Sequence, residues 1–400
     1  MTLRIGFLIS HPIQYYTPIF RELAGLCDLT VYFAHRQTAE EQAREGFGVA
    51  FDWNVDLMSG YHSKFLENVA ARPSTEHFGG RDTPGVAREI ADGRFDAFVV
   101  PGWGLRSYLQ AANACRRAGV PVFVRGDSQL MARRGMLIRL AKAIVFPRVL
   151  RRFDGFLYVG KRNREYLEHY GVHEDRLFFS PHCIDNDAFG IASDAARSVL
   201  GKDIARSLAA EDAAPLSRDR RILFVGKLIE RKRPLDVLCA AALIRSAGGA
   251  VEVAFAGSGE LEGELRREAA ATGVPTVFHG FVNQREMPAV YAAADVVVLP
   301  SDGRETWGLA VNEGMACGVP AVVSDKVGCG PDLIEEGTTG AVFSFGDVEA
   351  FARAVETAIS LDTPVVRRHI AARMAVYSPR RAAQGILEAA ARIAKRPSLG

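Results

Sequence analysis

Short apolar segments alternate with longer helical patterns along the whole chain. In its first half the apolar segments lie at residues 5–10, 29–34, 95–101, 121–125, 155–160 and 177–180. They are rich in Val, Ile and Phe and lack polar alternation, which predicts parallel strands buried on both faces. Helical patterns fill the intervals, for example at residues 105–118 and 161–170. The first half therefore predicts a series of β-α-β units.

The second half repeats this plan, with apolar segments at residues 221–226, 251–256, 276–280, 295–300, 321–324 and 341–345. A chain of 400 residues also exceeds what one hydrophobic core usually organises. The pattern predicts an α/β protein of two doubly wound, Rossmann-like domains that face each other across a cleft. Open parallel sheets bind ligands at the carboxyl ends of their strands, so we expect functional residues in the strand-to-helix loops.

The expected domain boundaries follow from the same pattern. Residues 1–190 are predicted to form an N-terminal domain and residues 221–375 a C-terminal domain. Residues 191–220 are polar and alanine-rich, which favours an interdomain connection with at most one surface helix. Residues 376–400 are helical in pattern and basic, and form a tail that can pack back on the N-terminal domain.

Composition narrows the class of protein. An apolar fraction of 48% with 24% charged residues is typical of a globular protein, and a net charge of +2 gives no argument for nucleic acid. The six cysteines form no Cys-x-x-Cys pair and lie in apolar surroundings, which favours free thiols in a reducing compartment. The first strand begins without a leader pattern, and no apolar run is long enough to span a membrane. We therefore expect a cytoplasmic protein.

Two lysines mark the first candidate site. Lys227 follows the strand at residues 221–226, and Lys232 precedes Pro234, a residue suited to the first turn of a helix. Two cations across a short loop, beside a helix N-terminus, can hold a pyrophosphate. A solvated basic loop is the alternative that the spacing alone leaves open.

Two glutamates mark the second candidate site. Glu305 lies in a loop after a strand, and Glu313 follows eight positions later inside a helix. Between them Gly308 permits a close backbone approach at the start of that helix. Glu313 can accept hydrogen bonds from a pair of ribose hydroxyls, and Glu305 from the hydroxyls of a sugar. For two carboxylates alone, a capping and a surface glutamate remain the simpler interpretation.

Six motifs occur in order over residues 221–355: Gly226-Lys227-Leu228 with Lys232; Ala256-Gly257-Ser258-Gly259; His279-Gly280-Phe281-Val282; Tyr291-Ala-Ala-Ala-Asp-Val-Val-Val-Leu-Pro-Ser301; Glu305-x7-Glu313-Gly-Met-Ala-Cys-Gly-Val-Pro320; and Glu335-Glu336-Gly337-x-x-Gly340. In this series the chain resembles the retaining GT-B glycosyltransferases of glycosyltransferase family 4. In the first half only residues 181–189 resemble that family, and there His182-Cys183 replaces a more usual Asn-Gly.

The resemblance implies a donor site for a nucleotide diphosphate-sugar in the C-terminal domain. Lys227 and Lys232, with Gly226, match the basic loop that neutralises the diphosphate. Lys227 departs from the commoner arginine, so a bidentate grip is lost there. Glu305 matches the glutamate that positions the donor sugar.

Further donor contacts are implied by the same resemblance. Gly308 and Leu309 match the residues whose backbone meets the phosphate, and Glu313 matches the ribose-binding carboxylate. Phe281 and Val282 match the position that contacts the base.

The resemblance also implies a reaction, in which a sugar moves to an acceptor with retention of configuration. The expected setting is the biosynthesis of a polysaccharide or of a lipid-linked glycolipid. Two lysines and a helix start can stabilise the charge that leaves on the diphosphate, which replaces a divalent metal. We expect no metal and no cofactor, with the nucleotide-sugar as a substrate. With no partner nucleophile evident, the departing phosphate oxygen is expected to accept the acceptor's proton.

The N-terminal domain is expected to bind the acceptor, a saccharide or a lipid-linked saccharide. His11 and Gln14 follow its first strand and can contact a ligand, although His11 is equally well explained as a turn residue. Trp103 follows another strand and can stack on a sugar, or pack in the core. Asp127 lies where many relatives place a histidine or aspartate near the reaction centre, so it joins Lys227, Lys232 and Glu305 as a candidate catalytic residue.

Two longer segments complete the predictions for the first half. Residues 60–85 are rich in Gly, Pro, His and Arg, and read as an acceptor-side loop. The segment from Arg133 to Arg152 mixes seven basic residues with many apolar ones. A basic amphipathic helix can lie on an anionic membrane surface, here the inner face of the membrane. An ordinary domain helix with a solvated basic face is the alternative.

Two other classes of function use the same features. A nucleotide-sugar epimerase on a GT-B fold would convert the donor alone, and a non-catalytic sugar-nucleotide-binding protein would convert nothing. The presence of both lysines and both glutamates argues against the second. A Rossmann dehydrogenase is disfavoured, because no Gly-x-Gly-x-x-Gly follows the first strand of either half.

Overall fold

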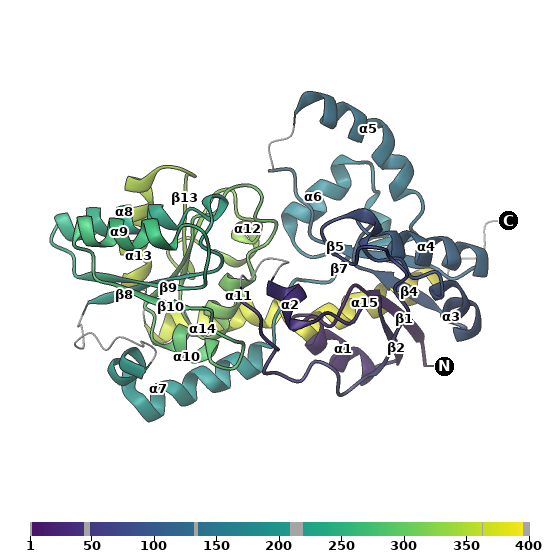
Figure 1. The fold of residues 1–400 in the computed structure, drawn as a ribbon, viewed down its shortest axis with the longest axis horizontal. Coiled ribbons are helices and arrows are strands. Elements are labelled where there is room, and N and C mark those ends of the chain that lie inside the picture. Colours follow the sequence, from purple (N-terminus) through teal and green to yellow (C-terminus); the bar gives the residue numbers. More distant parts are fainter. Residues whose placement is uncertain (1, 44–48, 132–134, 209–218, 362, 395–400) are drawn as a thin grey trace. The chain divides into compact units, whose positions relative to one another are not determined.

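The computed structural model describes residues 2–43, 49–131, 135–208, 219–361 and 363–394. The chain divides into two compact units (Figure 1). The N-terminal unit contains residues 1–45, 56–184 and 377–400, and the C-terminal unit contains residues 46–55 and 185–376. The chain therefore passes between the units four times.

The N-terminal unit is built on a seven-stranded sheet in the order β3-β2-β1-β4-β5-β6-β7, with every pair of neighbours parallel. Its strands are β1 (Arg4–Ile9), β2 (Asp28–Phe33), β3 (His62–Phe65), β4 (Ala97–Val100), β5 (Val122–Gly126), β6 (Gly155–Tyr158) and β7 (Leu177–Phe179). Its α-helices are α1 (Thr17–Ala24), α2 (Ala39–Gln42), α3 (Val86–Gly93), α4 (Arg106–Ala118), α5 (Met136–Leu150), α6 (Lys161–His169) and α15 (Pro379–Ala394).

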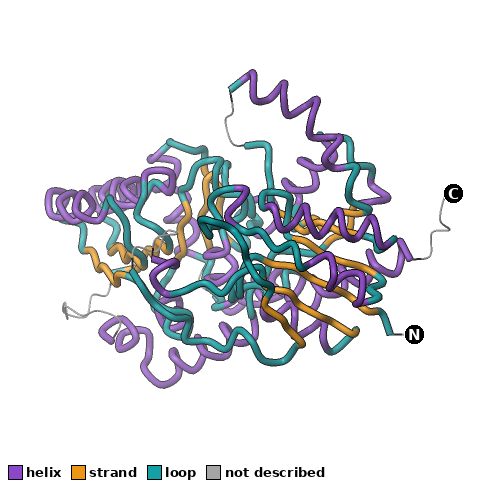
Figure 2. The backbone as a smooth tube through the Cα atoms, turned by 45° about the vertical axis from the view of Figure 1, so that its right-hand side comes forward, coloured by secondary structure: helices purple, strands orange, loops and turns teal. Residues whose placement is uncertain are grey.

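Helices cover both faces of this sheet (Figure 2). Because side chains alternate along a strand, Ile5, Phe7 and Ile9 of β1 pack on one face, with α1 and α15. Leu8 packs on the other face, in a core shared with α3, α4, α5 and α6. Both faces are thus buried, which explains why these strands read as continuous apolar runs.

The C-terminal unit is built on a six-stranded parallel sheet in the order β10-β9-β8-β11-β12-β13. Its strands are β8 (Arg220–Val225), β9 (Val251–Ala256), β10 (Thr276–Gly280), β11 (Val296–Leu299), β12 (Ala321–Ser324) and β13 (Gly340–Phe343). Its α-helices are α7 (Asn186–Leu208), α8 (Pro234–Ser246), α9 (Glu262–Thr272), α10 (Met287–Ala292), α11 (Leu309–Ala316), α12 (Gly330–Leu333), α13 (Val348–Ser360) and α14 (Pro364–Val376).

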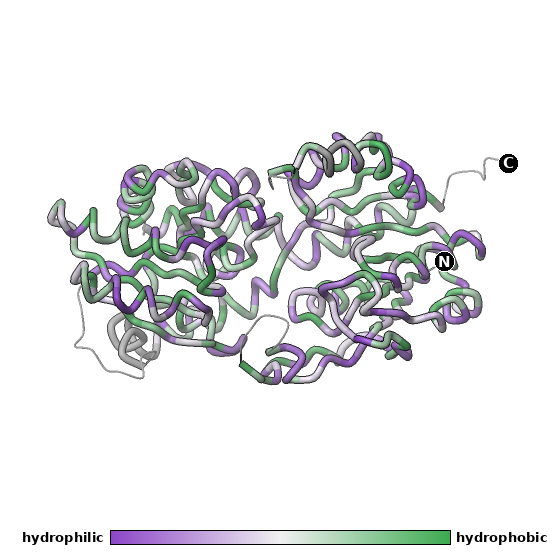
Figure 3. Tube along the Cα trace, turned by 45° about the horizontal axis from the view of Figure 1, so that its top comes forward, coloured by the Kyte–Doolittle hydropathy of each residue, from purple (hydrophilic) through white to green (hydrophobic). Residues whose placement is uncertain are grey.

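One face of this second sheet packs on α8, α9 and α13 in a single apolar core. On its other side α7 packs against α10 and α11, and α11 packs against α14. The helices of each unit carry both hydrophobic and hydrophilic positions (Figure 3), as expected where one face lies on a sheet.

The prediction of two doubly wound parallel-sheet domains is confirmed. Each of the twelve apolar segments corresponds to a strand of the structure, with ends that differ by at most two residues. The thirteenth strand, β3, lies inside residues 60–85, where we expected only a loop. This segment also contains a short 3-10 helix, Phe78–Gly80.

The segment at residues 191–220 differs from the expected connection. Residues 191–208 belong to α7, and this helix packs on α10 and α11 as a component of the C-terminal unit. The sequence did not indicate that α7 packs in this unit, because the helix is rich in alanine and each alanine buries little apolar area. At the other end of the chain, α15 packs on α1, β6 and β7 of the N-terminal unit.

All six cysteines are free thiols, and five of them are buried. Burial raises the pKa of Cys317 to about 12, so this thiol stays protonated at neutral pH. Among the described residues, no helix combines the length and apolar character needed to cross a membrane.

Candidate functional site

The predicted donor residues gather around one point of the C-terminal sheet. Strands β8 and β11 are neighbours there, and the strand order reverses between them, with β9 and β10 on one side and β12 and β13 on the other. Lys227 follows β8, whereas Glu305 and Gly308 follow β11. Loops at such a switch point diverge and leave room for a ligand, which makes this edge the candidate site.

A lysine and a glutamate pair directly across these two loops. The Lys232 ammonium donates to Glu305 Oε2 at 2.6 Å, and their side chains are only 13% and 15% exposed. Arg231 lies farther from the same oxygen, at 3.9 Å. Two of the predicted catalytic residues are therefore brought together in a partly buried ion pair, where water screens the charges less than at the surface.

Glycine explains how the loop after β8 comes so close to its neighbours. Gly257, after β9, has a φ of 140°, and a Cβ atom there would lie 2.1 Å from the Gly226 carbonyl oxygen. The Leu228 amide then donates to the Ser258 carbonyl at 2.9 Å. The two glycines of the Gly-Ser-Gly motif thus allow the loop after β9 to pack directly on the loop after β8, because a side chain at either position would clash with its backbone. Lys227 is partly buried in the same loop.

The start of α11 is shaped by another glycine. Gly308 precedes the helix with a φ of 106°, and a Cβ atom there would lie 2.5 Å from the Leu299 side chain. Leu309 is the first residue of the helix. The N–H groups of the first turn point along the helix axis beyond its N-terminus and carry partial positive charge. This end of α11 can therefore bind an anion.

Glu313 is held inside the unit by a tyrosine. Its carboxylate is 4% exposed and accepts a hydrogen bond from the Tyr291 hydroxyl at 2.7 Å. Tyr291, on α10, is fully buried. A charge-assisted bond of this kind fixes the orientation of a carboxylate. The sequence contained Tyr291 in one of the six motifs, but nothing in its spacing indicated this role.

In the N-terminal unit the strand order reverses at β1, which has β2 on one side and β4 on the other. His11 follows β1, and its Nδ1 lies 3.0 Å from Ser10 Oγ. Gln14 lies in the next turn. Trp103 follows β4 and packs edge-on against Phe146, with ring centres 4.9 Å apart. The Trp103 ring is therefore part of the packing around α5, which was one of the two interpretations of this residue.

Asp127 lies beside His182, which the sequence did not indicate as a candidate site residue. His182 follows β7, and its Nε2 lies 3.7 Å from Asp127 Oδ2. Nearby, the buried Arg125 donates to Ser180 Oγ at 3.1 Å and to the Pro181 carbonyl at 2.6 Å. The only signal for His182 in the sequence was its place in residues 181–189, where it replaces an asparagine.

Burial lowers the pKa of His182, and the Arg125 guanidinium lowers it further, against an opposing effect of Asp127. The neutral imidazole is therefore favoured at neutral pH. A neutral imidazole can accept a hydrogen bond from a hydroxyl group through one ring nitrogen, or donate one to it through the other. Burial likewise raises the pKa of Tyr16, whose ring lies under Arg125, so its hydroxyl is neutral too.

Residues 209–381 match the model of a family described as glycosyl transferases group 1. This match covers less than half of the chain and contains all the candidate donor residues. Among curated relatives, a sulfoquinovosyl transferase of Arabidopsis thaliana is 44% identical over 100 residues, or 24% of this chain and 19% of that protein. A GDP-mannose-dependent alpha-(1-6)-phosphatidylinositol dimannoside mannosyltransferase of Mycobacterium tuberculosis is 34% identical over 169 residues, or 42% of each protein. The chain thus spans less than half the length of these relatives.

A solved structure extends the likeness to nearly the whole chain. HepE of Anabaena in complex with UDP superposes with a TM-score of 0.66 at 16% identity, over 96% of this chain and 99% of that one. At this identity the likeness concerns the fold alone. It supports the prediction of a GT-B architecture.

The described part of the chain offers little to a metal ion. Among the residues that the structure describes, no three His, Cys, Asp or Glu side chains are grouped so that they could hold an ion. The chain has one Asp-x-Asp sequence, at residues 185–187, which is distant in sequence from Lys227 and Lys232. There Asp185 accepts a hydrogen bond from the Ala188 amide at 3.1 Å, so its carboxylate caps α7.

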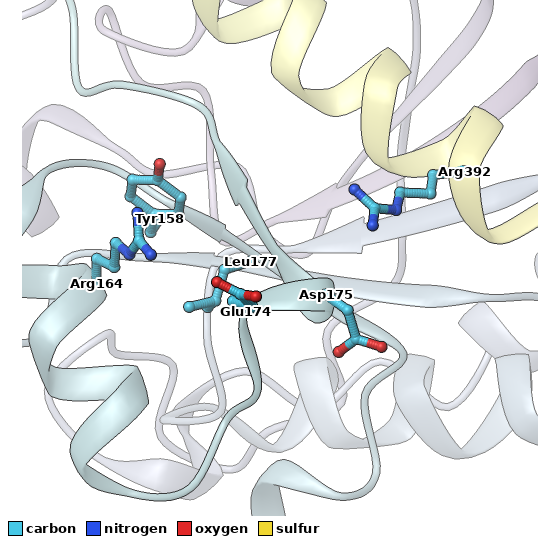
Figure 4. Close-up of a pocket in the computed structure, with 6 residues that line it drawn as sticks. All are labelled: Tyr158, Arg164, Glu174, Asp175, Leu177 and Arg392. Carbon is cyan, nitrogen blue, oxygen red and sulfur yellow. The ribbon is translucent and has the colours of Figure 1, made fainter.

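A surface pocket of 340 Å³ lies in the N-terminal unit (Figure 4). Its lining residues are Tyr158, Arg164, Glu174, Asp175, Leu177 and Arg392. Arg392 enters from α15, and the others surround the end of β6 and the start of β7. Acidic and basic groups are balanced there, and none of the candidate site residues contributes to it.

The basic segment from Arg133 to Arg152 forms α5 over most of its length, although Arg133 and Arg134 lie outside the described residues. Phe146 and Leu150 are buried in the core of the N-terminal unit. Ile144 and Val145, in contrast, are 63% and 56% exposed. The helix thus has a buried face, as in an ordinary domain helix, and a second apolar surface that is exposed.

Proposed function

We propose that the chain is a retaining glycosyltransferase of glycosyltransferase family 4, which transfers a sugar from a nucleotide diphosphate-sugar to an acceptor without a metal. The observation that carries this proposal is the pair of Lys232 and Glu305, joined at 2.6 Å beside the start of α11. One member offers a positive charge for a phosphate. The other offers a carboxylate for sugar hydroxyls.

Each donor residue has a distinct task in this proposal. Lys227, Lys232 and the first-turn amides at Gly308 and Leu309 bind the diphosphate. Glu313, oriented by Tyr291, accepts hydrogen bonds from the ribose, and Phe281 and Val282 contact the base. Glu305 positions the sugar ring.

The reaction breaks the bond between the sugar C1 atom and the diphosphate oxygen, while the acceptor hydroxyl oxygen bonds to C1 on the same face. The departing phosphate oxygen takes the hydroxyl proton, so no protein nucleophile is required. Negative charge grows on that oxygen as the bond breaks. A fixed lysine ammonium therefore interacts more strongly with the transition state than with the bound donor.

The acceptor is proposed to bind the N-terminal unit near His11, Gln14, Trp103 and Asp127. The names of two relatives, a sulfoquinovosyl transferase and a phosphatidylinositol dimannoside mannosyltransferase, support a glycolipid or polysaccharide pathway. A lipid-linked saccharide is thus a reasonable first acceptor to test. The exposed apolar surface of α5 is consistent with work at an anionic membrane.

A panel of nucleotide-sugars tests the donor proposal. A ligand that binds only the folded state raises the midpoint of thermal unfolding, so the true donor should give the largest shift. The selected donor is then incubated with and without saccharide acceptors. Transfer only in the presence of an acceptor supports the proposal, whereas conversion of the donor alone would identify an epimerase. No conversion under either condition would favour a binding protein.

Two further measurements address the finer points of the proposal. Nuclear magnetic resonance of the product compares its anomeric configuration with that of the donor, and an inverted product would contradict retention. Turnover in excess chelator is expected to equal turnover without it. Loss of activity that Mg²⁺ or Mn²⁺ restores would contradict metal independence.

A further inference from the structure

A short segment from the first quarter of the chain belongs to the C-terminal unit. Residues 46–55 are grouped with residues 185–376, although the chain on either side belongs to the N-terminal unit. Within it, residues 51–54 make specific contacts with the loop that follows β10, and we call these four residues the strap. The contacts join positions more than 220 residues apart in sequence.

Aromatic rings form the first of these contacts. The Phe51 ring lies 4.2 Å from the Phe281 ring, centre to centre, with the planes inclined at 36°. Trp53 packs edge-on against Phe51 at 4.9 Å. All three rings are only partly buried, so they present apolar surface that a further ring could cover.

Hydrogen bonds hold the strap on the same loop. The Asn283 side chain donates to the Asp52 carbonyl at 2.9 Å. The Asn54 amide group donates to Glu286 Oε2 at 2.8 Å, and its Oδ1 accepts from the Arg285 amide at 3.2 Å. Bonds from both ends of the loop fix the strap more firmly than ring stacking alone would do.

The loop that carries Phe281 is tied to the candidate diphosphate site. The Gly257 amide donates to the Gly280 carbonyl at 2.7 Å, and the Gly226 amide donates to the Ala256 carbonyl at 2.9 Å. The strand ends of β10, β9 and β8 are thus linked side by side. A molecule with its diphosphate at Lys232 can extend along this edge toward Phe281.

We propose that the strap forms part of the nucleobase end of the donor site, with Phe51 as a positioning residue that holds the Phe281 ring against the base of a nucleoside diphosphate. This inference rests on the proposed function. Phe51 acts through Phe281, because it stacks on that ring and prevents it from turning away. Its contribution therefore depends on the base and not on the phosphates.

The test compares the affinities of the full chain for UDP, GDP and ADP by calorimetry. In Phe51→Ala the nucleotide that binds tightest should lose about three- to tenfold in affinity, the range of a lost aromatic pair. The other two should lose less, so that the preference between bases narrows. Phe51→Tyr keeps the ring and should retain the preference. Leu243→Ala, which truncates an exposed apolar side chain of α8, is the matched control and should change nothing.

A second arm asks whether Phe51 acts through Phe281. In a Phe281→Ala background, Phe51→Ala should have no further effect on the preference between bases. Equal weakening of all three nucleotides by Phe51→Ala, or no change, would overturn the inference and leave the strap as a structural attachment. If the unaltered protein binds none of the three, the proposed function itself fails, and the failure does not depend on the strap.

Discussion

Both units place polar residues after the carboxyl ends of parallel strands, but they organise these residues differently. At the end of β8 and β11, opposite charges meet at hydrogen-bonding distance, as in Lys232 with Glu305. In the N-terminal unit, His182 and Asp127 are 3.7 Å apart, and burial favours the neutral histidine. One region is thus prepared for a strongly charged ligand, the other for hydroxyl groups. In the proposed function, the charged region would bind the diphosphate and the neutral region the saccharide.

The largest effect is expected from the charged region. Lys232→Ala should lower the turnover number about a hundredfold or more, as for the removal of one fixed group that stabilises transition-state charge. It also leaves Glu305 with only the more distant Arg231 among the ion pairs described above. Turnover number and Michaelis constant are measured together, with circular dichroism as a check on the fold.

Lys64→Ala is the matched control, because Lys64 also pairs with a glutamate, Glu89, at 2.6 Å, but on the N-terminal unit. It should keep normal kinetics. If Lys232→Ala instead raised only the Michaelis constant, the lysine would bind donor and transition state equally well. The charged region of the C-terminal unit would then contribute to donor binding and not to the chemical step.

Glu313→Gln should have the next largest effect. Loss of hydrogen bonds to a charged acceptor costs about 1.5–3 kcal/mol of binding free energy. The affinity for a nucleoside diphosphate should therefore fall roughly tenfold to hundredfold. Calorimetry measures this change, and Glu264→Gln on the exposed side of α9 is the control. Tyr291→Phe, which keeps the carboxylate but removes its hydrogen bond, should fall between them. Equal affinities for all variants would remove Glu313 from the site.

A smaller, pH-dependent effect is expected in the N-terminal unit. Since the pKa of His182 is lowered in the folded state, the unfolded chain binds the proton more readily. Stability should thus decline as the pH falls below the usual histidine value of 6.5 and level off below the lowered pKa. The difference between the melting midpoints of wild type and His182→Asn should be constant at high pH and change in this window, where the wild type loses more stability. Parallel curves would show that His182 titrates normally.

The weakest effect is expected from α5. The protein should bind anionic vesicles weakly and less at high salt, since each basic residue near such a surface contributes about 1 kcal/mol. Ile144→Glu with Val145→Glu should abolish binding in vesicle sedimentation. Ile191→Glu alters a side chain with 73% exposure on α7 and should not. No binding by the unaltered protein at low salt would leave α5 as a domain helix only.

The sequence indicated candidate residues more clearly in the C-terminal unit than in the N-terminal unit, for a physical reason. Lys232, Glu305 and Glu313 lie beside glycines that the backbone geometry requires, so motif and geometry carry the same information. His182 and Arg125 depend on burial among strands that are distant in sequence. Their arrangement is visible only after the sheet has formed.

Two other elements escaped prediction because their sequences lack a pattern of their own. Strand β3 reads His-Ser-Lys-Phe and lies at the edge of its sheet, where polar residues are tolerated. The strap has no periodicity, and its partners Asn283 and Glu286 lie far along the chain. Local propensity cannot indicate a contact of that span.

The path of the chain also sets an order of events during synthesis. Helix α15 buries Ala382, Ile386 and Ala389 in the same core as Phe7 and Phe20 of the N-terminal unit. Until residues 379–394 have been made, that face of the first sheet is covered only in part, by α1, although its seven strands have long been complete. The C-terminal unit needs nothing beyond residue 376. The domain encoded second can therefore finish folding first, while the nascent N-terminal domain waits with an apolar surface that a chaperone could recognise.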